Sequence, residues 1–127
     1  MCGIVGSVGV TNIDMFKDAL QELKLRGPDF EGLKKISEDV FFGHRRLAII
    51  DLKESGNQPM GSKEEGLDII FNGEIYNYKE LKNELIKKYQ FYSDSDTEVI
   101  LKCFREYGFK ETINKLDGMF TFAIYDY

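Results

Sequence analysis

The sequence is poor in the residues that build many catalytic centres. It has one histidine, His44, so any Cys-His or Ser-His scheme would have to run through that residue. Its two cysteines, Cys2 and Cys103, lie far apart and form neither a metal-ligand spacing nor a redox spacing. We therefore expect no metal site and no redox pair, and we expect a reduced, cytoplasmic protein.

Long apolar runs and clusters of basic residues are also missing. No segment approaches the roughly 18 apolar residues of a membrane span, and the N-terminus MCGIVGSVG lacks the basic and long apolar regions of a signal peptide. The net charge is −5 and the basic pairs are short, whereas nucleic-acid binding needs clustered lysines and arginines. We therefore expect neither a membrane nor a nucleic acid as a partner.

What is present is a globular composition. Hydrophobic residues make up 43% of the 127 residues and charged residues 31%, enough for one domain with a real core. Hydrophobic periodicity and turn residues predict strands at 3–10, 39–52 (one long or two broken), 67–76 and 118–127, and helices at 13–25, 78–89 and 97–107. These come in blocks without steady βαβ alternation, which favours an α+β layered fold.

Two of these elements carry more specific expectations. Asn77 and Glu80 form a variant of the capping box at the start of the helix at 78–89. The aromatic run 118–127 is typical of a central strand with neighbours on both sides, yet the chain stops there. Its partner strands then come from earlier in the chain or from another molecule, or the chain is a fragment of something longer.

Position 2 is the first place where the sequence suggests chemistry. Methionine aminopeptidase removes Met1 when the next side chain is small, and Cys2 qualifies. The mature chain would then begin with a thiol nucleophile and a free α-amine, a usable general base, on the same residue. Taken alone, however, Cys2 is better explained as an ordinary small buried residue.

Several other segments strengthen the chemical interpretation of Cys2. They follow one another in the order MCGIVG, RGPD, GHRRLAIIDL, QPM, NGEIYNY, SDTEVIL and DGMFTFAIYD. In this order they resemble the N-terminal glutaminase domain of glutamine-hydrolysing asparagine synthetases, a class II glutamine amidotransferase of the Ntn-hydrolase type. The resemblance covers essentially all of residues 1–127 and implies an αββα sandwich of antiparallel sheets, incomplete at its C-terminus.

Variants within these segments distinguish the branches of the class. Hexosephosphate aminotransferases typically carry RGYDS, GHTRWATHG and NGIIENY, whereas this chain has RGPDF, GHRRLAIID and NGEIYNY. The latter set resembles the asparagine synthetase branch, although branches that amidate sugars or other acceptors use it too. Glutamine is the expected ammonia donor and asparagine synthesis the expected use, with amidation of a sugar or another carboxylate as the alternative.

The resemblance also implies roles for individual residues. Cys2 would attack the side-chain carbonyl of glutamine and form a thioester, with the Asn72 side chain and the Gly73 backbone N–H as oxyanion donors. Arg46 would bind the α-carboxylate bidentately, and Asp96 the α-ammonium. The glutamine pocket implied in this way comprises Arg46, Leu47, Ala48, Ile49, Ile50, Asn72, Gly73, Glu74 and Asp96.

Simpler explanations compete with several of these roles. Asn72-Gly73 is also a strong hairpin signal, and Asp96 also fits the N-cap of the following helix. We expect Arg45 to be a solvated strand residue, and His44 to serve strand packing rather than catalysis.

Two departures from the family pattern matter. Leu25 stands where the family usually has histidine before RGPD, and we expect Arg26 and Asp29 to order this loop over Cys2. The family continues beyond DGMFTFAIYD into further strands and an ATP-pyrophosphatase domain, and no synthetase domain or phosphate loop is found here. We therefore expect no cofactor in this domain, and ATP and Mg only in the absent synthetase domain.

Three hypotheses follow. The chain is a glutaminase half that supplies ammonia to an ATP-dependent synthetase domain or subunit, a truncated fragment without turnover, or an inactive partner module that keeps the fold. The presence of every expected catalytic residue argues against the last. In each case an exposed edge on the C-terminal strand would favour a homodimer.

Overall fold

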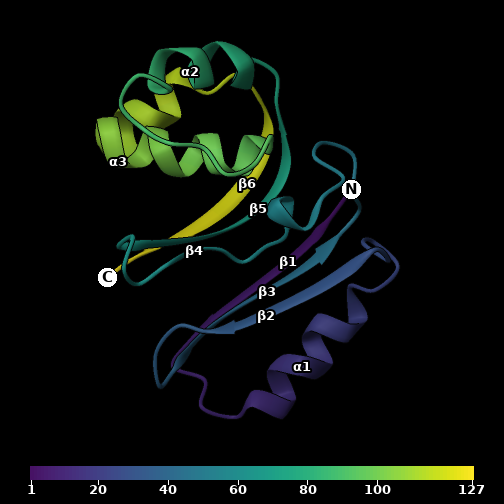
Figure 1. The fold of residues 1–127 in the computed structure, drawn as a ribbon. Coiled ribbons are helices and arrows are strands. Elements are labelled where there is room, and N and C mark those ends of the chain that lie inside the picture. The colour runs from purple at the N-terminus through teal and green to yellow at the C-terminus, as the bar shows by residue number, and fades with distance from the viewer.

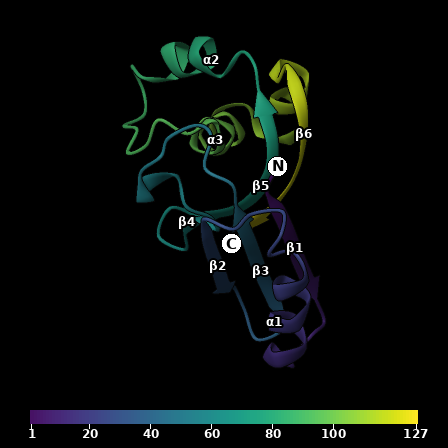
Figure 2. The same ribbon diagram turned by 90° about the vertical axis from the view of Figure 1, so that its right-hand side faces the viewer.

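Two antiparallel three-stranded sheets lie face to face in the computed structural model, which describes residues 1–127. One sheet has the order β1-β3-β2 and the other the order β4-β5-β6. Helix α1 covers the outer face of the first sheet, and helices α2 and α3 cover the outer face of the second (Figures 1 and 2). This αββα arrangement confirms the α+β sandwich expected from the sequence.

Each segment predicted from the sequence contains an element of the expected type. The strands are β1 (Gly3–Val8), β2 (Phe30–Lys35), β3 (Val40–Arg46), β4 (Met60–Ser62), β5 (Leu67–Ile75) and β6 (Gly118–Asp126), and the helices are α1 (Ile13–Glu22), a short 3₁₀ helix (Glu54–Gly56), α2 (Tyr78–Leu85) and α3 (Asp96–Lys115). Strands β2 and β4 were not predicted. Residues 47–52, predicted as strand, form the loop after β3 instead.

Strand β3 is the centre of the first sheet, and its side chains alternate between two faces. Phe41 packs against Phe16 of α1 with ring centroids 5.4 Å apart, and Arg45 donates to the Leu20 carbonyl on the same helix. Phe42 and His44, which alternate with these residues, point the other way, toward the second sheet. Arg45 is therefore buried rather than solvated, and the expectation for this residue was wrong.

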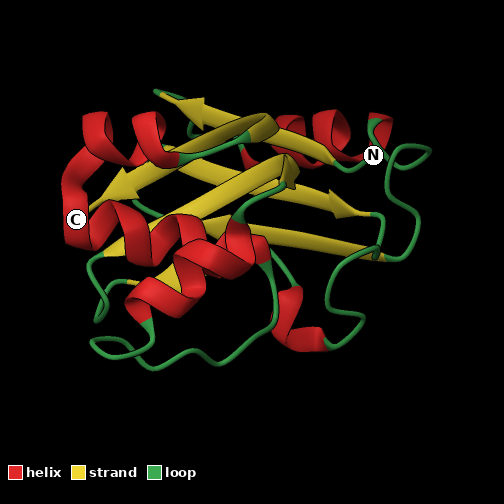
Figure 3. Ribbon diagram, turned by 90° about the horizontal axis from the view of Figure 1, so that it is seen from above, coloured by secondary structure: helices red, strands yellow, loops and turns green.

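The second sheet and its two helices enclose the larger hydrophobic core. Viewed from above, α2 and α3 lie over the strands of this sheet (Figure 3). Alternate residues of β5 face the helices, and the buried members of the core are Leu67, Ile69, Phe71, Ile75, Leu81, Leu85, Val99, Ile100, Leu101 and Cys103. Cys103 is thus a core residue, as its place on the apolar helix face indicated. None of the helices has both the length and the apolar character needed to cross a membrane.

A capping residue determines where helix α3 begins, and a glycine determines where it bends. The hydroxyl of Ser95 accepts the backbone N–H of Thr97, so Ser95 is the N-cap and Asp96 is the first helical residue. The interpretation of Asp96 as N-cap was therefore wrong. At Gly108 the backbone has a φ of 73°, which only glycine adopts readily, and the helix bends there before continuing to Lys115.

A further expectation about local structure was wrong. Asn77 does not cap α2 with its side chain. Its carboxamide instead joins the end of α3, because Nδ2 donates to the Lys115 carbonyl at 2.8 Å and Oδ1 accepts from the Asp117 N–H at 3.1 Å. Strand β6 pairs with β5 on one side, and its other edge has no partner strand within residues 1–127, so the prediction that it has neighbours on both sides stays a prediction.

Candidate functional site

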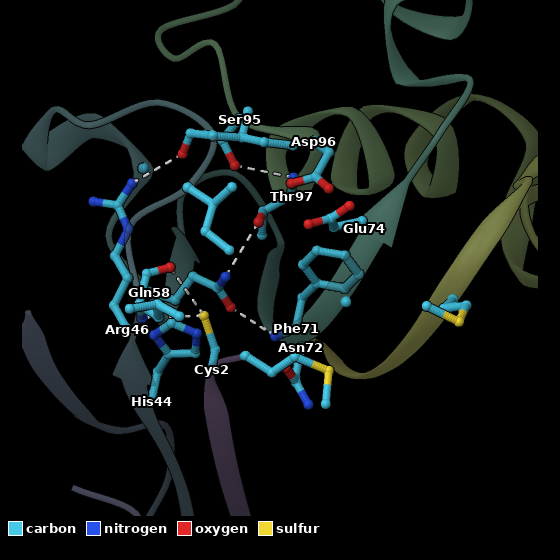
Figure 4. A pocket seen from close by; sticks show the side chains of 17 residues that line it. Cys2, His44, Arg46, Gln58, Phe71, Asn72, Glu74, Ser95, Asp96 and Thr97 are labelled. Carbon is cyan, nitrogen blue, oxygen red and sulfur yellow. Dashed lines mark hydrogen bonds between the residues drawn. The ribbon is translucent and has the colours of Figure 1, made fainter. Parts of the chain in front are cut away.

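A cavity of about 180 Å³ opens between the two sheets beside the N-terminal end of α3 (Figure 4). It is lined by Met1, Cys2, His44, Arg46, Leu47, Ile49, Ile50, Gly56, Gln58, Phe71, Asn72, Gly73, Glu74, Ser95, Asp96, Thr97 and Met119. Every residue that the sequence assigned to the site is among them except Ala48. Segments far apart in the sequence, namely the N-terminus, the end of β3, the middle of β5 and the start of α3, therefore meet here.

Cys2 lies just before β1 with its thiol in the cavity. The thiol is free, and its Sγ accepts the backbone N–H of Leu47 at 3.3 Å. The RGPD loop packs beside it, since Arg26 Nε donates to the Cys2 carbonyl at 3.0 Å and Asp29 accepts the Ala48 N–H at 2.8 Å. These bonds agree with the expectation that Arg26 and Asp29 order the loop, and they direct Ala48 toward that loop rather than the cavity.

Arg46 borders the cavity on the face of β3 opposite to Arg45. Its guanidinium is engaged by the loop that follows β3, and the acceptors are the carbonyl oxygens of Ile50, Asp51 and Lys53 and the Oδ1 of Asn57. A Cβ at Gly56 would collide with the same guanidinium, so glycine lets the loop close around it. Arg46 thus holds this loop in place while it presents a positive charge beside the cavity.

Asn72 and Gly73 lie inside β5 rather than in a turn, so the hairpin interpretation was wrong. The Oδ1 of Asn72 is buried without a hydrogen-bond partner in the chain, and the side chain forms no other bond. Gly73 has a φ of 153°, and a Cβ there would collide with the carbonyl oxygen of Met119 on β6. Close approach of the neighbouring strand therefore requires this glycine, whatever ligand lies beside it.

The first turn of α3 supplies the acidic end of the cavity. Asp96 is buried, and its Oδ2 accepts the Ile75 N–H at 3.1 Å. Burial raises the pKa of the Asp96 carboxyl above its ordinary value, and the negative charge of Glu74 adds to this, while backbone N–H groups oppose it. Glu74 is exposed at the rim, so the two carboxyls converge from β5 and α3 (Figure 4).

His44 lies in the wall of the cavity near Cys2, although the sequence suggested only a packing role (Figure 4). Its side chain is 0% exposed, and neither ring nitrogen has a hydrogen-bond partner. Burial lowers the pKa of His44 from 6.5 to about 4; a backbone contact with Phe71 opposes the shift, and the charge of Arg46 adds to it. The ring is therefore neutral at physiological pH.

Sequence patterns did not assign Gln58, Ser95 or Thr97 to the site. Gln58 belongs to the QPM segment, and its position directly before a proline gave no sign that its side chain would be buried in a cavity wall. Ser95 and Thr97 flank Asp96, so a search of the residues around each predicted ligand would have found them.

The layers give the fold first. An αββα sandwich with a free cysteine directly before its first strand matches the fold of a solved amidotransferase. The glutamine phosphoribosylpyrophosphate amidotransferase from B. subtilis, solved in complex with ADP and GMP, has this fold. It matches with a TM-score of 0.82 and 21% identity over 99% of this chain and 35% of its own.

Sequence comparison then gives the family. A model of the glutamine amidotransferase domain matches residues 1–127, and the chain belongs to this family. It is 46% identical to the glutamine-hydrolysing asparagine synthetase 1 of Bacillus subtilis over 134 residues, and 42% identical to the glutamine-hydrolysing asparagine synthetase of Zea mays over 131 residues. These matches cover 99% of this chain but only 21% and 22% of the two relatives.

Proposed function

We propose that this domain hydrolyses the side-chain amide of glutamine, with Cys2 as nucleophile after removal of Met1. The observation that carries the proposal is the convergence on one cavity of a free thiol, an arginine, an amide without an internal partner and a buried carboxyl. Glutamine offers a matching set of groups, namely a carboxamide, an α-carboxylate and an α-ammonium.

The reaction starts at the thiol. Cys2 Sγ attacks the side-chain carbonyl carbon, and the α-amine that loss of Met1 exposes takes up the thiol proton. The oxyanion is stabilised by the Asn72 NH₂ and the Gly73 N–H, each such donor being worth about 3–4 kcal/mol. Collapse breaks the C–N bond, the amine returns the proton to the leaving group, and ammonia departs. Water then cleaves the thioester, which yields glutamate and restores the thiol.

Recognition of the amino-acid end uses the opposite charges on either side of the cavity. Arg46 binds the α-carboxylate, which requires its guanidinium to exchange some of the loop oxygens it now contacts. Asp96 and Glu74 bind the α-ammonium, and a cation between them relieves both the burial of Asp96 and the repulsion between the two carboxyls. Leu47, Ile49 and Ile50 line the path between these ends.

We propose asparagine synthesis as the use of the ammonia, because the most similar relatives reported above are glutamine-hydrolysing asparagine synthetases. The chain spans about a fifth of their length, so the ATP- and Mg-dependent amide synthesis is assigned to a partner domain or subunit in the cytoplasm. Amidation of a sugar or another carboxylate is the alternative use. The outer edge of β6 is free to pair with further chain or with a second copy in a homodimer.

Two measurements test the glutaminase proposal. The protein should release glutamate from glutamine, and Cys2→Ala should release none. A diazo-ketone analogue of glutamine should give a single adduct, located by mass spectrometry on an N-terminal Cys2. Retention of Met1 together with an absence of adduct would contradict the proposal, and would instead favour a partner module that keeps the fold without turnover.

A further inference from the structure

Gln58 is a buried side chain, 6% exposed, that bridges two walls of the cavity. Its Oε1 accepts the backbone N–H of Phe71 at 2.6 Å, and its Nε2 donates to the Thr97 hydroxyl at 3.1 Å (Figure 4). The orientation of the carboxamide is fixed chemically, because the Phe71 N–H can only donate and so requires the oxygen. Both hydrogen-bonding ends of Gln58 are therefore used within the chain.

Gln58 takes the place of a strand at this point of the sheet. Strand β4 pairs with β5 only from Met60 to Ser62, opposite Ile69 to Leu67. Beyond Ile69 the β4 side of β5 has no strand partner, and the side chain of Gln58 satisfies the Phe71 N–H there. Its backbone is fixed as well, because the Gln58 carbonyl oxygen lies so close to Gly32 of β2 that a Cβ at Gly32 would collide with it. The residue thus contacts both sheets and helix α3.

The two groups that Gln58 joins stand next to the two ends of the proposed glutamine site. Phe71 directly precedes Asn72, which serves the reacting carboxamide, and Thr97 directly follows Asp96, which serves the α-ammonium. A bridge between Phe71 and Thr97 therefore sets how far apart these two ends lie. Strand β5 also packs against α3 through the hydrophobic core, and the Ile75 N–H binds Asp96 further along β5, but the Gln58 bridge lies in the cavity wall itself.

We propose that Gln58 is a positioning residue that fixes the length of the amino-acid amide accepted by this site, and so favours glutamine over asparagine, which is one methylene shorter. The inference rests on the proposed glutaminase function. Gln58 touches neither the thiol nor the reacting amide in this assignment. Its effect acts through the distance between β5 and the first turn of α3. A difference of one methylene between two substrates changes the ratio of their kcat/KM values by roughly tenfold or more.

Asn77 provides a matched control because it is a similar bridge at the opposite end of α3. Its carboxamide also accepts one backbone N–H, from Asp117, and also donates one hydrogen bond, to the Lys115 carbonyl. It does not line the cavity. A loss of stability that comes simply from cutting a carboxamide bridge to α3 should therefore appear in Asn77→Ala as well as in the Gln58 variants.

The experiment compares wild type, Gln58→Met, Thr97→Val and Asn77→Ala. Ammonia release from glutamine and from asparagine gives the ratio of the two kcat/KM values. Gln58→Met should lower the glutamine-to-asparagine ratio about tenfold or more, and Thr97→Val, which cuts only the α3 side of the bridge, should lower it less. Asn77→Ala should lower the melting temperature without moving the ratio. The rate of Cys2 alkylation by iodoacetamide should stay at the wild-type value throughout.

The outcomes separate the inference from the proposed function. An unchanged ratio in folded Gln58→Met overturns the inference, as does an equal fall in ratio for Asn77→Ala. If Gln58→Met does not fold, Thr97→Val decides in the same way. If the wild type releases no ammonia, the glutaminase proposal has failed. Protection of Cys2 from iodoacetamide by glutamine and by asparagine then measures the two affinities, and Gln58→Met must narrow their difference for the inference to stand.

Discussion

Two neighbouring arginines of β3 occupy very different environments, because successive side chains of a strand point to opposite faces of the sheet. Arg45 points toward α1 and is 7% exposed, and its guanidinium contacts the Leu20 carbonyl and the side chains of Gln21 and Glu31. Arg46 points between the sheets, where it holds a loop and borders the cavity. An arginine therefore binds the covering helix on one face of the sheet, and an arginine lines the cavity on the other face.

The two faces also differ in how well their polar groups are satisfied. On the α1 side the guanidinium of Arg45 finds partners in α1 and β2, and one buried polar atom, the Oγ of Ser7, has none. On the cavity side, both nitrogens of His44 and the Oδ1 of Asn72 are buried without partners. An unpaired buried polar group costs about 1–3 kcal/mol, so a face that keeps several of them is built for something other than stability. The difference separates the face that stabilises the fold from the face that lines the proposed glutamine site.

The largest effect is expected at Arg46. Replacing it with alanine removes the charge proposed to bind the α-carboxylate and leaves the loop oxygens without a donor. We expect kcat/KM for glutamine to fall about 10²–10³-fold, mainly through KM, because hydrogen bonds to charged groups are worth about 1.5–3 kcal/mol each. Initial-rate measurements of glutamate release check this. Arg46→Lys should recover little, since an ammonium cannot copy the planar fork.

A rise in KM for Arg45→Ala as large as that for Arg46→Ala would contradict this assignment, because it would mean that the two faces of β3 are not distinct. Hydrogen exchange provides a second readout. Arg46→Ala should raise exchange in residues 50–57, which the guanidinium now holds, and should leave exchange in α1 unchanged.

The next largest effect is expected from the pH dependence of stability at His44. Its folded-state pKa is about 4 against an ordinary value of 6.5. Between these values the unfolded chain takes up a proton that the folded chain does not, so stability is lost as pH falls from 6.5 to 4. The loss approaches about 3 kcal/mol over this window. Urea unfolding at several pH values should show it in wild type.

His44→Gln is the control for this prediction. It removes the titrating ring, whereas the carboxyl groups that titrate at acid pH remain in both proteins. The difference in unfolding free energy between His44→Gln and wild type should therefore change steadily from pH 6.5 to 4. Parallel curves for the two proteins would show that the ring is already charged or has a partner in the fold.

A smaller effect is expected on the other face of the strand. Arg45→Met keeps much of the aliphatic stem but removes the bonds to Leu20 and Gln21 of α1. We expect the free energy of unfolding to fall by about 1–3 kcal/mol, while kcat/KM for glutamine stays within about twofold of wild type. Denaturant unfolding and the glutaminase assay together measure this. A selective loss of activity without loss of stability would contradict it.

Much of this arrangement could be predicted from the sequence. Hydrophobic periodicity located β1, β3, β5, β6 and the three longer helices, and ordered motifs identified most residues of the cavity. What could not be predicted depends on partners distant in the chain. Strand β2, with the sequence FEGLKK, has weak apolar alternation, and it becomes a strand because it pairs with β3.

The errors at individual residues have the same origin. Arg45 and Arg46 are the same residue type, so local sequence does not distinguish them. The register of β3 decides which of the two points toward α1 and which points toward the second sheet. Asn77 has the local pattern of a capping residue, but a partner some forty residues away, Asp117, competes for its oxygen. Local sequence patterns could not predict the contacts of the Gln58 side chain, because its partners, Phe71 and Thr97, lie far from it in the sequence.

The smallest effect is expected at Glu31, which pairs with Arg45 across β2 and β3. The side chain of Glu31 is 47% exposed, so water screens the ion pair, and exposed pairs contribute about 0–1 kcal/mol. Glu31→Gln keeps an acceptor for the guanidinium, and we expect the unfolding free energy to change by less than about 0.5 kcal/mol, with the change diminishing in 1 M salt. A cost comparable to that of Arg45→Met would show that Arg45 depends on this charge rather than on its bonds to α1. The stabilising face of β3 would then be held to its neighbouring strand, and not to the helix that covers it.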